Sequence, residues 1–258
     1  MKKMKMFMSE VNDFPMWRSN RGWRARIGVI YPGGGWSHIE DFYKLAPKGV
    51  TIGGAGVPRH KDESYEEMLR LDEWVVDRAA NLAAYKPECV IWACTAGSFL
   101  KGKGHDERLI KEMEAATGAP CTTTSTAIKC AFEELGIKKF ALATPYPHDV
   151  NLVEKKFFED NGFVVTNMAE LDIIDNLIIA NISPNVLYHL AKAADTPDAD
   201  AVFISCTGLD TLDIIEPLEY DLGKPVITSN QASYWHAFKL ARVGEPIKGY
   251  GTLLDRPR

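Results

Sequence analysis

The sequence has 258 residues, a formal net charge of −5 and a pI near 5.7. This length can form one large domain or two smaller ones, and a mildly acidic chain without a basic stripe argues against a nucleic-acid partner. No apolar run approaches the length of a membrane span, so we expect no membrane partner.

Residues 1–25 mix Lys, Met, Asp and Arg and lack the apolar centre of a signal peptide. We therefore expect them to be an N-terminal extension of a cytoplasmic protein. The cysteines are odd in number, and no pair has the two-residue spacing of a zinc or redox motif, so reduced thiols and no metal site are expected. The five are Cys89, Cys94, Cys121, Cys130 and Cys206.

The first half of the chain alternates predicted strands and helices. Apolar residues at helical spacing predict a single helix over residues 64–85, opened by a capping box of Ser64 and Glu67. After the first strand, Pro32 and Gly33 begin a glycine-rich loop that lets the backbone approach a ligand closely. The strands are predicted at residues 26–32, 50–54, 90–94 and 120–124. The remaining helices are predicted at residues 105–117 and 125–135, the latter capped by Ser125.

The same order then starts again in the second half. Strands are predicted at residues 139–145, 162–165, 201–205 and 225–229, and helices at 149–160, 184–194 and up to Leu240. The offset between matching landmarks is nearly constant. It is 113 residues from Pro32 to Pro145, 112 from Cys94 to Cys206 and 105 from Pro120 to Pro225.

These offsets indicate two similar α/β halves with parallel sheets and helices on both faces. We expect a pseudo-two-fold axis between the halves and an active site in the cleft between them. The predicted boundaries are 1–125 for the first half and 126–258 for the second, whose C-terminal helix could pack back on the first half.

Two strands end in the same motif. Val-Ile-Trp-Ala-Cys-Thr-Ala-Gly covers residues 90–97, and Val-Phe-Ile-Ser-Cys-Thr-Gly covers 202–208. In both, the cysteine lies at the carboxyl end of a strand, where open α/β sheets bind their ligands. A thiol beside a helix N-terminus has a lowered pKa, and the same backbone N–H groups can bind a carboxylate together with hydroxyls. The residues predicted to bind in this way are Thr95, Ala96, Thr207 and Gly208.

Two such thiols on opposite sides of a substrate could act as base and acid. One would remove a proton from a carbon and the other would deliver one to the far face, which inverts a stereocentre without a cofactor. Alternatively, one thiolate adds covalently to an activated double bond. The competing interpretation is that each cysteine is a small buried apolar residue. We favour it for Cys89, Cys121 and Cys130, but not for Cys94 and Cys206, whose contexts match.

The chain resembles the aspartate/glutamate racemase superfamily, in particular its arylmalonate decarboxylase and maleate cis-trans isomerase branch. The resemblance is strongest at residues 120–127, 141–151, 205–213 and 249–251. It implies that Cys206 is the cysteine which both enzymes use. It also implies that Cys94 matches the isomerase nucleophile, at a position where the decarboxylase has glycine.

The same resemblance implies substrate-binding roles for three further residues. Thr95 matches a threonine that binds carboxylate, and Tyr146 matches a tyrosine whose hydroxyl does so. Asn176 resembles an isomerase asparagine that binds substrate, although a helix cap explains it equally well. The sequence also departs from the family. Residues 33–36 replace an Asn-containing isomerase loop, and Ala96 stands where the decarboxylase has serine.

Residues 57–60 are more polar than the wall of an aryl pocket. Arg59 or His60 could meet a second carboxylate, with solvated surface charge as the alternative. The substrate therefore stays open. We predict a cofactor-independent isomerase of a small carboxylate, either a racemase or a cis-trans isomerase. The alternatives are a decarboxylase that protonates an enediolate from Cys206, and a non-catalytic small-acid binding protein. The glycine-rich loop lacks a dinucleotide fingerprint, so no cofactor is expected, and the sequence allows a homodimer.

Overall fold

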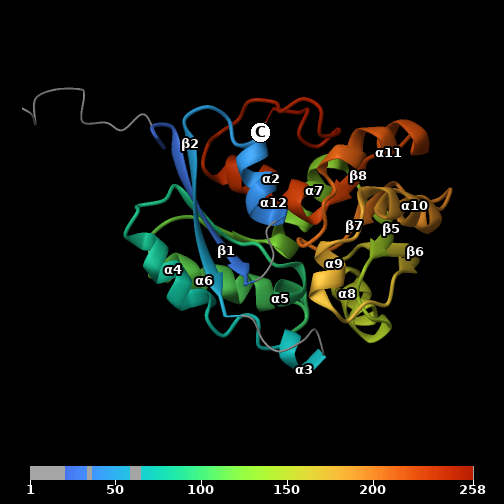
Figure 1. The fold of residues 1–258 in the computed structure, drawn as a ribbon, viewed down its shortest axis with the longest axis horizontal. Helices are drawn as coiled ribbons and strands as arrows, with labels where there is room; N and C mark the ends of the chain where they lie inside the picture. Colours follow the sequence, from blue (N-terminus) through green and yellow to red (C-terminus); the bar gives the residue numbers. More distant parts are fainter. Residues whose placement is uncertain (1–20, 34–36, 59–64, 258) are drawn as a thin grey trace, which may run out of the picture.

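The computed structural model describes residues 21–33, 37–58 and 65–257. Within them the chain forms two four-stranded parallel sheets that lie side by side with helices around them (Figure 1). The strand order is β2-β1-β3-β4 in one sheet and β6-β5-β7-β8 in the other, so the second sheet repeats the topology of the first. The predicted α/β fold with two similar halves is confirmed.

The first half supplies four strands and six helices among the described residues. The strands are β1 (Ala25–Pro32), β2 (Val50–Val57), β3 (Cys89–Trp92) and β4 (Cys121–Thr123). The helices are α2 (Ser37–Leu45), α3 (Tyr65–Met68), α4 (Val75–Ala83), α5 (Thr95–Phe99), α6 (His105–Thr117) and α7 (Thr124–Leu135).

The second half supplies the same number of strands. They are β5 (Lys139–Thr144), β6 (Val164–Glu170), β7 (Ala201–Ile204) and β8 (Val226–Thr228). Its helices are α8 (His148–Asp160), α9 (Asn176–Ala180), α10 (Pro184–Ala194), α11 (Ile215–Leu222) and α12 (Ser229–Leu240), with a 3₁₀ turn over Leu212–Ile214 before α11.

The complete burial of the two central strands explains why the residues before Cys94 and Cys206 form continuous apolar runs in the sequence. Every residue of β3 and of β7 is buried, as expected for parallel strands covered on both faces. β3 pairs with β1 and β4, and β7 pairs with β5 and β8. Each cysteine turn therefore follows a central strand of its sheet, and the strands on either side fix the position of the turn.

The helix that follows the last strand of each sheet packs against the other half. Phe132 of α7 lies with its ring 4.8 Å from Phe140 of β5 and 5.9 Å from Phe203 of β7. α12, which follows β8, lies against β3, β4 and α2 of the first half and alongside α7 (Figure 1). The two halves thus share one packed junction. The division at residues 125 and 126 stays a prediction.

Two local predictions were wrong. The expected helix over residues 64–85 is interrupted, since α3 ends at Met68 and α4 begins at Val75. Between them lies buried Asp72, whose carboxylate binds Lys101 at 2.6 Å and His105 at 2.8 Å. The turn that brings Asp72 inward is not compatible with a continuous helix. Ser64, the expected cap, lies outside the described residues.

The cap of α7 also differs from the prediction. Thr123, not Ser125, accepts the N-terminal hydrogen bond, from the amide of Thr126. Among the described residues, none of the helices combines the length and apolar character needed to cross a membrane.

Candidate active site

The first cysteine turn is built by a side-chain cap. Cys94 follows β3 in an extended conformation and is the N-cap of α5, where its Sγ accepts a hydrogen bond from the Gly97 amide at 3.3 Å. Gly97 has to be glycine, because a Cβ there would lie 2.8 Å from the Trp92 ring and 3.2 Å from the Cys94 sulfur. The Cys94 side chain is therefore held among fixed neighbours and is almost fully buried.

The second cysteine turn repeats the sulfur contact with a different backbone. Cys206 follows β7, and its Sγ accepts a hydrogen bond from the Gly208 amide at 3.3 Å. Its φ is 95°, a region that non-glycine residues rarely adopt and that costs on the order of 1–3 kcal/mol. The Cys206 amide donates to Ser229 Oγ at 3.0 Å, which helps to hold this strained turn.

Hydrogen bonds tie the two turns to each other. The hydroxyl of Thr207 donates to the carbonyl oxygen of Ala93 at 3.3 Å, directly before Cys94. From the other side, the hydroxyl of Thr95 donates to Ser229 Oγ at 3.0 Å, the same oxygen that accepts from the Cys206 amide. The structure therefore brings both predicted cysteines and both predicted threonines together at the junction of the two halves.

Tyr146 joins this group from β5. It is buried, its hydroxyl is hydrogen-bonded to Cys206, and its ring centroid lies 6.3 Å from that of Phe99 in α5. Burial, followed by the electrostatic influence of Cys206, Glu154 and Cys94, raises the pKa of Tyr146 well above its usual value. Tyr146 is thus a neutral hydroxyl, and the charges of both thiols influence its pKa.

The other predicted substrate-binding residues lie at the same edge. Ala96 is buried in α5. Pro32 is the last residue of β1, and Gly33 follows it. At this end of the strand the Ala93 amide donates to the Ile30 carbonyl, and the Gly33 amide donates to the Val57 carbonyl. Gly208 follows the Cys206 turn, and its carbonyl accepts a hydrogen bond from Ser37.

Asn176 begins α9, but the cap of this helix is Asp175, whose carboxylate accepts from the amides of Leu177 and Ile178. The capping alternative for Asn176 is therefore wrong. Ile179, one turn later on the same helical face, lies 3.7 Å from the place where a Gly208 Cβ would stand. This places the face that carries Asn176 towards the Cys206 turn. Arg59 and His60 lie outside the described residues.

Sequence reasoning missed the residues that hold the turns in place. Ser229 binds parts of both turns, yet its only local signal is its position after the fourth strand of the second half. His38 at the start of α2 was also missed. Its ring lies 5.0 Å from that of Tyr31, and burial lowers its pKa to about 4, an effect that the neighbouring backbone of Thr207 only partly opposes. His38 is therefore a neutral, buried imidazole.

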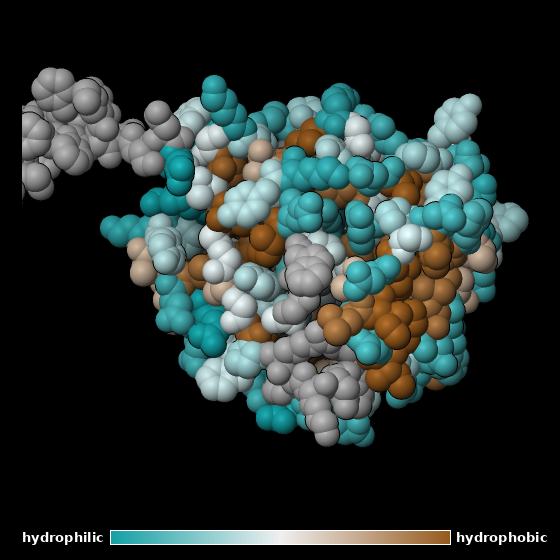
Figure 2. Space-filling view, viewed as in Figure 1, coloured by the Kyte–Doolittle hydropathy of each residue, from teal (hydrophilic) through white to brown (hydrophobic). Residues whose placement is uncertain are grey.

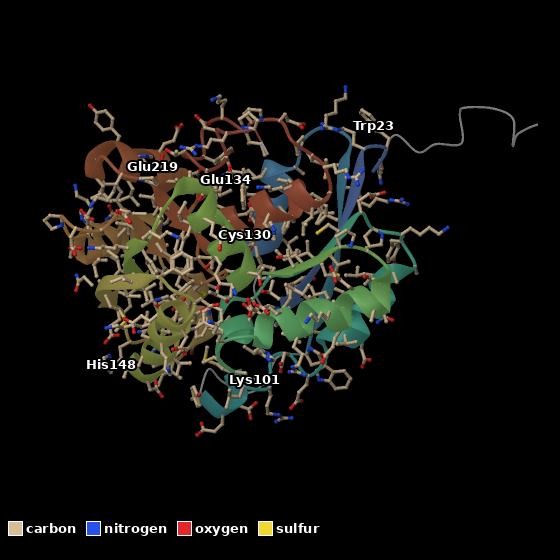
Figure 3. The ribbon with its side chains drawn as sticks, turned by 180° about the vertical axis from the view of Figure 1, so that it is seen from behind. Trp23, Lys101, Cys130, Glu134, His148 and Glu219 are labelled. Carbon is tan, nitrogen blue, oxygen red and sulfur yellow. The ribbon has the colours of Figure 1, made fainter. Side chains whose placement is uncertain are left out.

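The remaining cysteines have the environment of structural residues. Burial raises the pKa of Cys89 well above its usual value and that of Cys121 to about 11. Burial also raises the pKa of Cys130, which lies on α7 one turn before Glu134 (Figure 3). Thiols with raised pKa values are poor nucleophiles at neutral pH, so these three fit the apolar interpretation.

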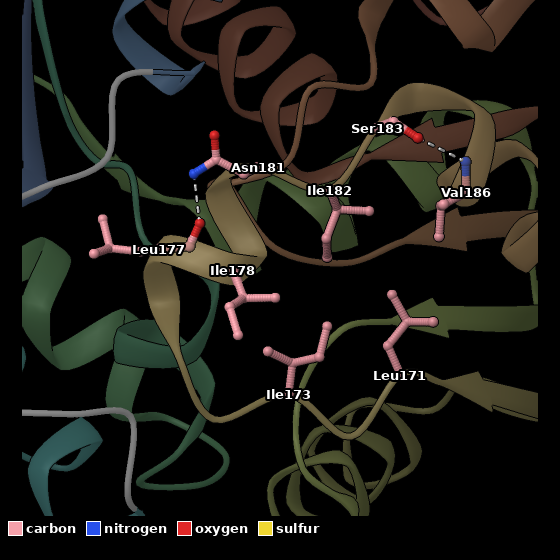
Figure 4. A pocket seen from close by; sticks show the side chains of 8 residues that line it. All are labelled: Leu171, Ile173, Leu177, Ile178, Asn181, Ile182, Ser183 and Val186. Atoms are coloured by element: carbon pink, nitrogen blue, oxygen red, sulfur yellow. Dashed lines mark hydrogen bonds between the residues drawn. The ribbon is translucent and has the colours of Figure 1, made fainter.

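An apolar groove lies between α9, α10 and the segment after β6, within the brown area at the right of Figure 2. Figure 4 shows the side chains of Leu171, Ile173, Ile178 and Ile182 turned towards one another. The Asn181 amide donates to the Leu177 carbonyl at 2.6 Å. None of its described lining residues carries a charge, so this part of the groove is not suited to bind a carboxylate. Its lining residues are Leu171, Ile173, Leu177, Ile178, Asn181, Ile182, Ser183 and Val186.

Within the described part of the chain, no group of three or more His, Cys, Asp or Glu side chains could hold a metal ion. The groups that converge at the junction are two thiols, each receiving a backbone N–H, and hydroxyls from both halves. Such a set can bind a carboxylate and move protons at a neighbouring carbon.

Comparison with known proteins agrees with this chemistry. The family model for arylmalonate decarboxylase matches residues 45–254. An arylmalonate decarboxylase of Bordetella bronchiseptica is 35% identical over 233 residues, covering 89% of this chain and 96% of the relative. A maleate isomerase of Geobacillus stearothermophilus is 26% identical over 243 residues, covering 89% and 97%.

Among solved structures, the maleate isomerase of Pseudomonas putida S16 with maleate superimposes with a TM-score of 0.84 at 25% identity, covering 90% of this chain and 97% of that one. Both kinds of relative therefore span nearly the whole chain. The chain belongs to the arylmalonate decarboxylase family, in the branch of the aspartate/glutamate racemase superfamily that also holds the maleate isomerases, as the sequence motifs predicted.

Proposed function

We propose that this protein is a cofactor-independent isomerase of a small carboxylic acid and that Cys94 and Cys206 work on the same substrate molecule. The observation that carries the proposal is the hydrogen-bonded link between the two cysteine turns through Ala93, Thr207 and Ser229. Because each half contributes one thiol to this junction, a substrate bound there meets a proton-transferring group from either side.

In a racemisation, the thiolate of one cysteine takes the proton from the carbon next to the substrate carboxylate. The electron pair left on that carbon is delocalised onto the carboxylate, which is stabilised by hydroxyl and backbone N–H donors. The thiol of the other cysteine then delivers its proton to the opposite face. The roles of the two cysteines are exchanged after one turnover and reverse in the next.

In a cis-trans isomerisation, the Cys94 thiolate forms a bond to one carbon of the double bond, and the Cys206 thiol protonates the other carbon. Rotation about the resulting single bond follows. The Cys206 thiolate then removes a proton from the carbon that it had protonated, the sulfur–carbon bond breaks, and the double bond re-forms. No oxidant, reductant or further reactant is consumed.

Decarboxylation of a substituted malonate is the second candidate. It is favoured by the higher identity to the arylmalonate decarboxylase, 35% against 26% for the maleate isomerase. In this reaction one carboxylate leaves as carbon dioxide, and Cys206 protonates the enediolate that remains. The presence of Cys94 argues against it, because decarboxylation needs only one proton donor. A non-catalytic binding protein is disfavoured because the family consists of enzymes.

The test is a panel of acids incubated with the native protein in deuterium oxide. The panel contains maleate, single enantiomers of 2-substituted carboxylic acids, and phenylmalonate. Formation of fumarate, or of the opposite enantiomer with deuterium at the inverted carbon, supports the isomerase. Release of carbon dioxide from phenylmalonate, with no isomerisation of any other acid, would replace it by the decarboxylase.

A further inference from the structure

A carboxyl group is buried next to the Cys206 turn without a charged partner. Glu154 lies in the middle of α8 and is 0% exposed. Its Oε1 accepts a hydrogen bond from the hydroxyl of Ser205 at 2.6 Å, and Ser205 directly precedes Cys206. Its Oε2 is also buried and has no hydrogen-bond partner among the described residues. An ionised carboxylate with a bare oxygen is costly to bury, so the neutral acid is the stable form here.

Among the residues that the structure describes, none places a compensating positive charge next to Glu154. α5, which packs on α8, has no charged side chain. From β6, Glu170 faces α8, but its carboxylate is bound by His148 and Asn151. Lys129 of α7 lies over the ring of Phe157 and is paired with Asp106. Of the titratable groups in the candidate site, Tyr146 is one on which Glu154 acts electrostatically.

Burial raises the pKa of Glu154 to about 8, and the hydrogen bond from Ser205 lowers it only in part. The carboxyl group also acts electrostatically on Tyr146, whose hydroxyl is bound to Cys206. Glu154 therefore reaches the Cys206 turn in two ways. Its carboxyl group accepts a hydrogen bond from Ser205, the residue before Cys206, and it acts electrostatically on Tyr146, whose hydroxyl is hydrogen-bonded to the Cys206 side chain. A negative charge on Glu154 would oppose a negative charge on that sulfur.

We propose that Glu154 is a positioning residue that controls the charge of Cys206: as a neutral acid it holds Ser205 and permits the Cys206 thiolate, and once ionised it suppresses that thiolate. The proposal deepens the function above, since it gives the proposed acid–base cysteine a second group that sets its protonation. It also means that the Cys206 thiolate forms at higher pH once Glu154 is ionised.

The test measures thiol reactivity, which needs no substrate. The rate of alkylation of Cys206 by iodoacetamide is followed by peptide mass spectrometry from pH 6 to pH 10, in the native protein and in three variants. Glu154→Gln keeps an acceptor for Ser205 but cannot ionise. Glu159→Gln makes the same change at an exposed position of the same helix. Ser205→Ala removes the hydrogen bond that lowers the pKa of Glu154.

We expect the ratio of the Glu154→Gln rate to the native rate to be near one at pH 7 and to rise severalfold between pH 8 and pH 9. About tenfold is the upper limit for a rise of one unit in the pKa of Cys206, because part of the thiol is already ionised at pH 9. Glu159→Gln should match the native protein at every pH. In the native protein the plot of the Cys206 alkylation rate against pH should change slope where Glu154 ionises, and Ser205→Ala should move this change of slope to higher pH. If Glu154→Gln does not fold, the direction in which Ser205→Ala moves it still tests the proposal.

A ratio that stays constant with pH, or a Ser205→Ala profile that breaks at the native pH, would overturn the role of Glu154. Both readouts are independent of turnover. If the panel of acids finds no isomerisation while the Cys206 profiles behave as expected, the proposed function fails and the charge control by Glu154 stands. If the panel shows isomerisation but the Cys206 profiles do not behave as expected, the charge control by Glu154 is rejected and the proposed isomerase stands.

Discussion

Replacing Ser229 by alanine tests whether one hydroxyl holds both cysteine turns. Ser229 Oγ accepts hydrogen bonds from the Thr95 hydroxyl and from the Cys206 amide, both at 3.0 Å, and the side chain is fully buried. The change leaves two buried donors without an acceptor. It also removes a restraint from Cys206, whose φ of 95° is strained and needs support from its surroundings.

A buried donor left unsatisfied costs about 1–3 kcal/mol, so two of them should lower the free energy of unfolding by roughly 2–6 kcal/mol. For a chain of this size that loss lowers the melting temperature by roughly 4–24 °C. Because Cys206 can then relax towards an ordinary conformation, its sulfur moves relative to Cys94. We expect turnover to fall by more than tenfold at a temperature where the variant is still folded.

Ser233→Ala is the matched control. Ser233 lies one turn further along α12, is equally buried, and donates a single hydrogen bond to Thr124 at 3.0 Å, away from both cysteine turns. It should cost about 1 kcal/mol in stability and leave turnover at the native level. Urea unfolding gives the free energies, and initial rates with the acid identified in the panel give the activities. Equal turnover in the two variants would refute the reasoning about Ser229.

Two further predictions concern charge. Tyr146→Phe removes the hydroxyl bound to Cys206, and losing a hydrogen bond to a charged group costs about 1.5–3 kcal/mol, so kcat/KM should fall roughly 10- to 150-fold without loss of fold. Tyr188→Phe, at a half-buried tyrosine that donates to Asp221 away from both cysteines, is the control. If both variants keep native kinetics, Tyr146 is outside the site. The second prediction is that the free energy of unfolding falls between pH 6.5 and pH 8. In that range the folded protein holds more protons than the unfolded chain on two buried acids, so stability falls as pH rises. The buried histidines oppose this fall only in part, because the unfolded histidines lose their remaining protons as pH rises above 6.5. Urea unfolding at the two pH values tests this, and a rise would contradict it. These acids are Asp41 and Glu154, with pKa values raised to about 7 and 8, and these histidines are His38 and His236, with pKa values lowered to about 4.

The strands and the position of the cysteine pair could be predicted from the sequence, because both depend on local pattern. The buried runs before Cys94 and Cys206 are apolar throughout, as parallel strands with two covered faces must be. The repeat in the chain then predicts that both cysteines end equivalent strands. That both turns meet at one junction is shown by the hydrogen bonds from Thr207 to Ala93 and from Thr95 to Ser229.

The features that were missed depend on contacts between distant residues. No local pattern in the sequence predicts that Asp72 contacts His105, which lies 33 residues away, or that the chain turns between α3 and α4 at this residue. Glu154 stands among lysines in an amphipathic helix and reads as a surface charge, yet it is buried against Ser205, 51 residues away. Ser229 binds a hydroxyl 134 residues away. Local periodicity cannot predict such partners, because only the packing of the two halves creates them.

The need for Cys94 tests the central claim most directly. Native protein, Cys94→Gly and Cys206→Ser are compared on the same acid, with solvent deuterium tracked at the product carbon. We predict that Cys94→Gly abolishes isomerisation, because one side of the substrate loses its proton-transferring group. Cys206→Ser should suppress it as well, since a serine hydroxyl is a far weaker acid than a thiol. Full native activity in Cys94→Gly would contradict the two-thiol mechanism and leave the decarboxylase as the better account of this protein.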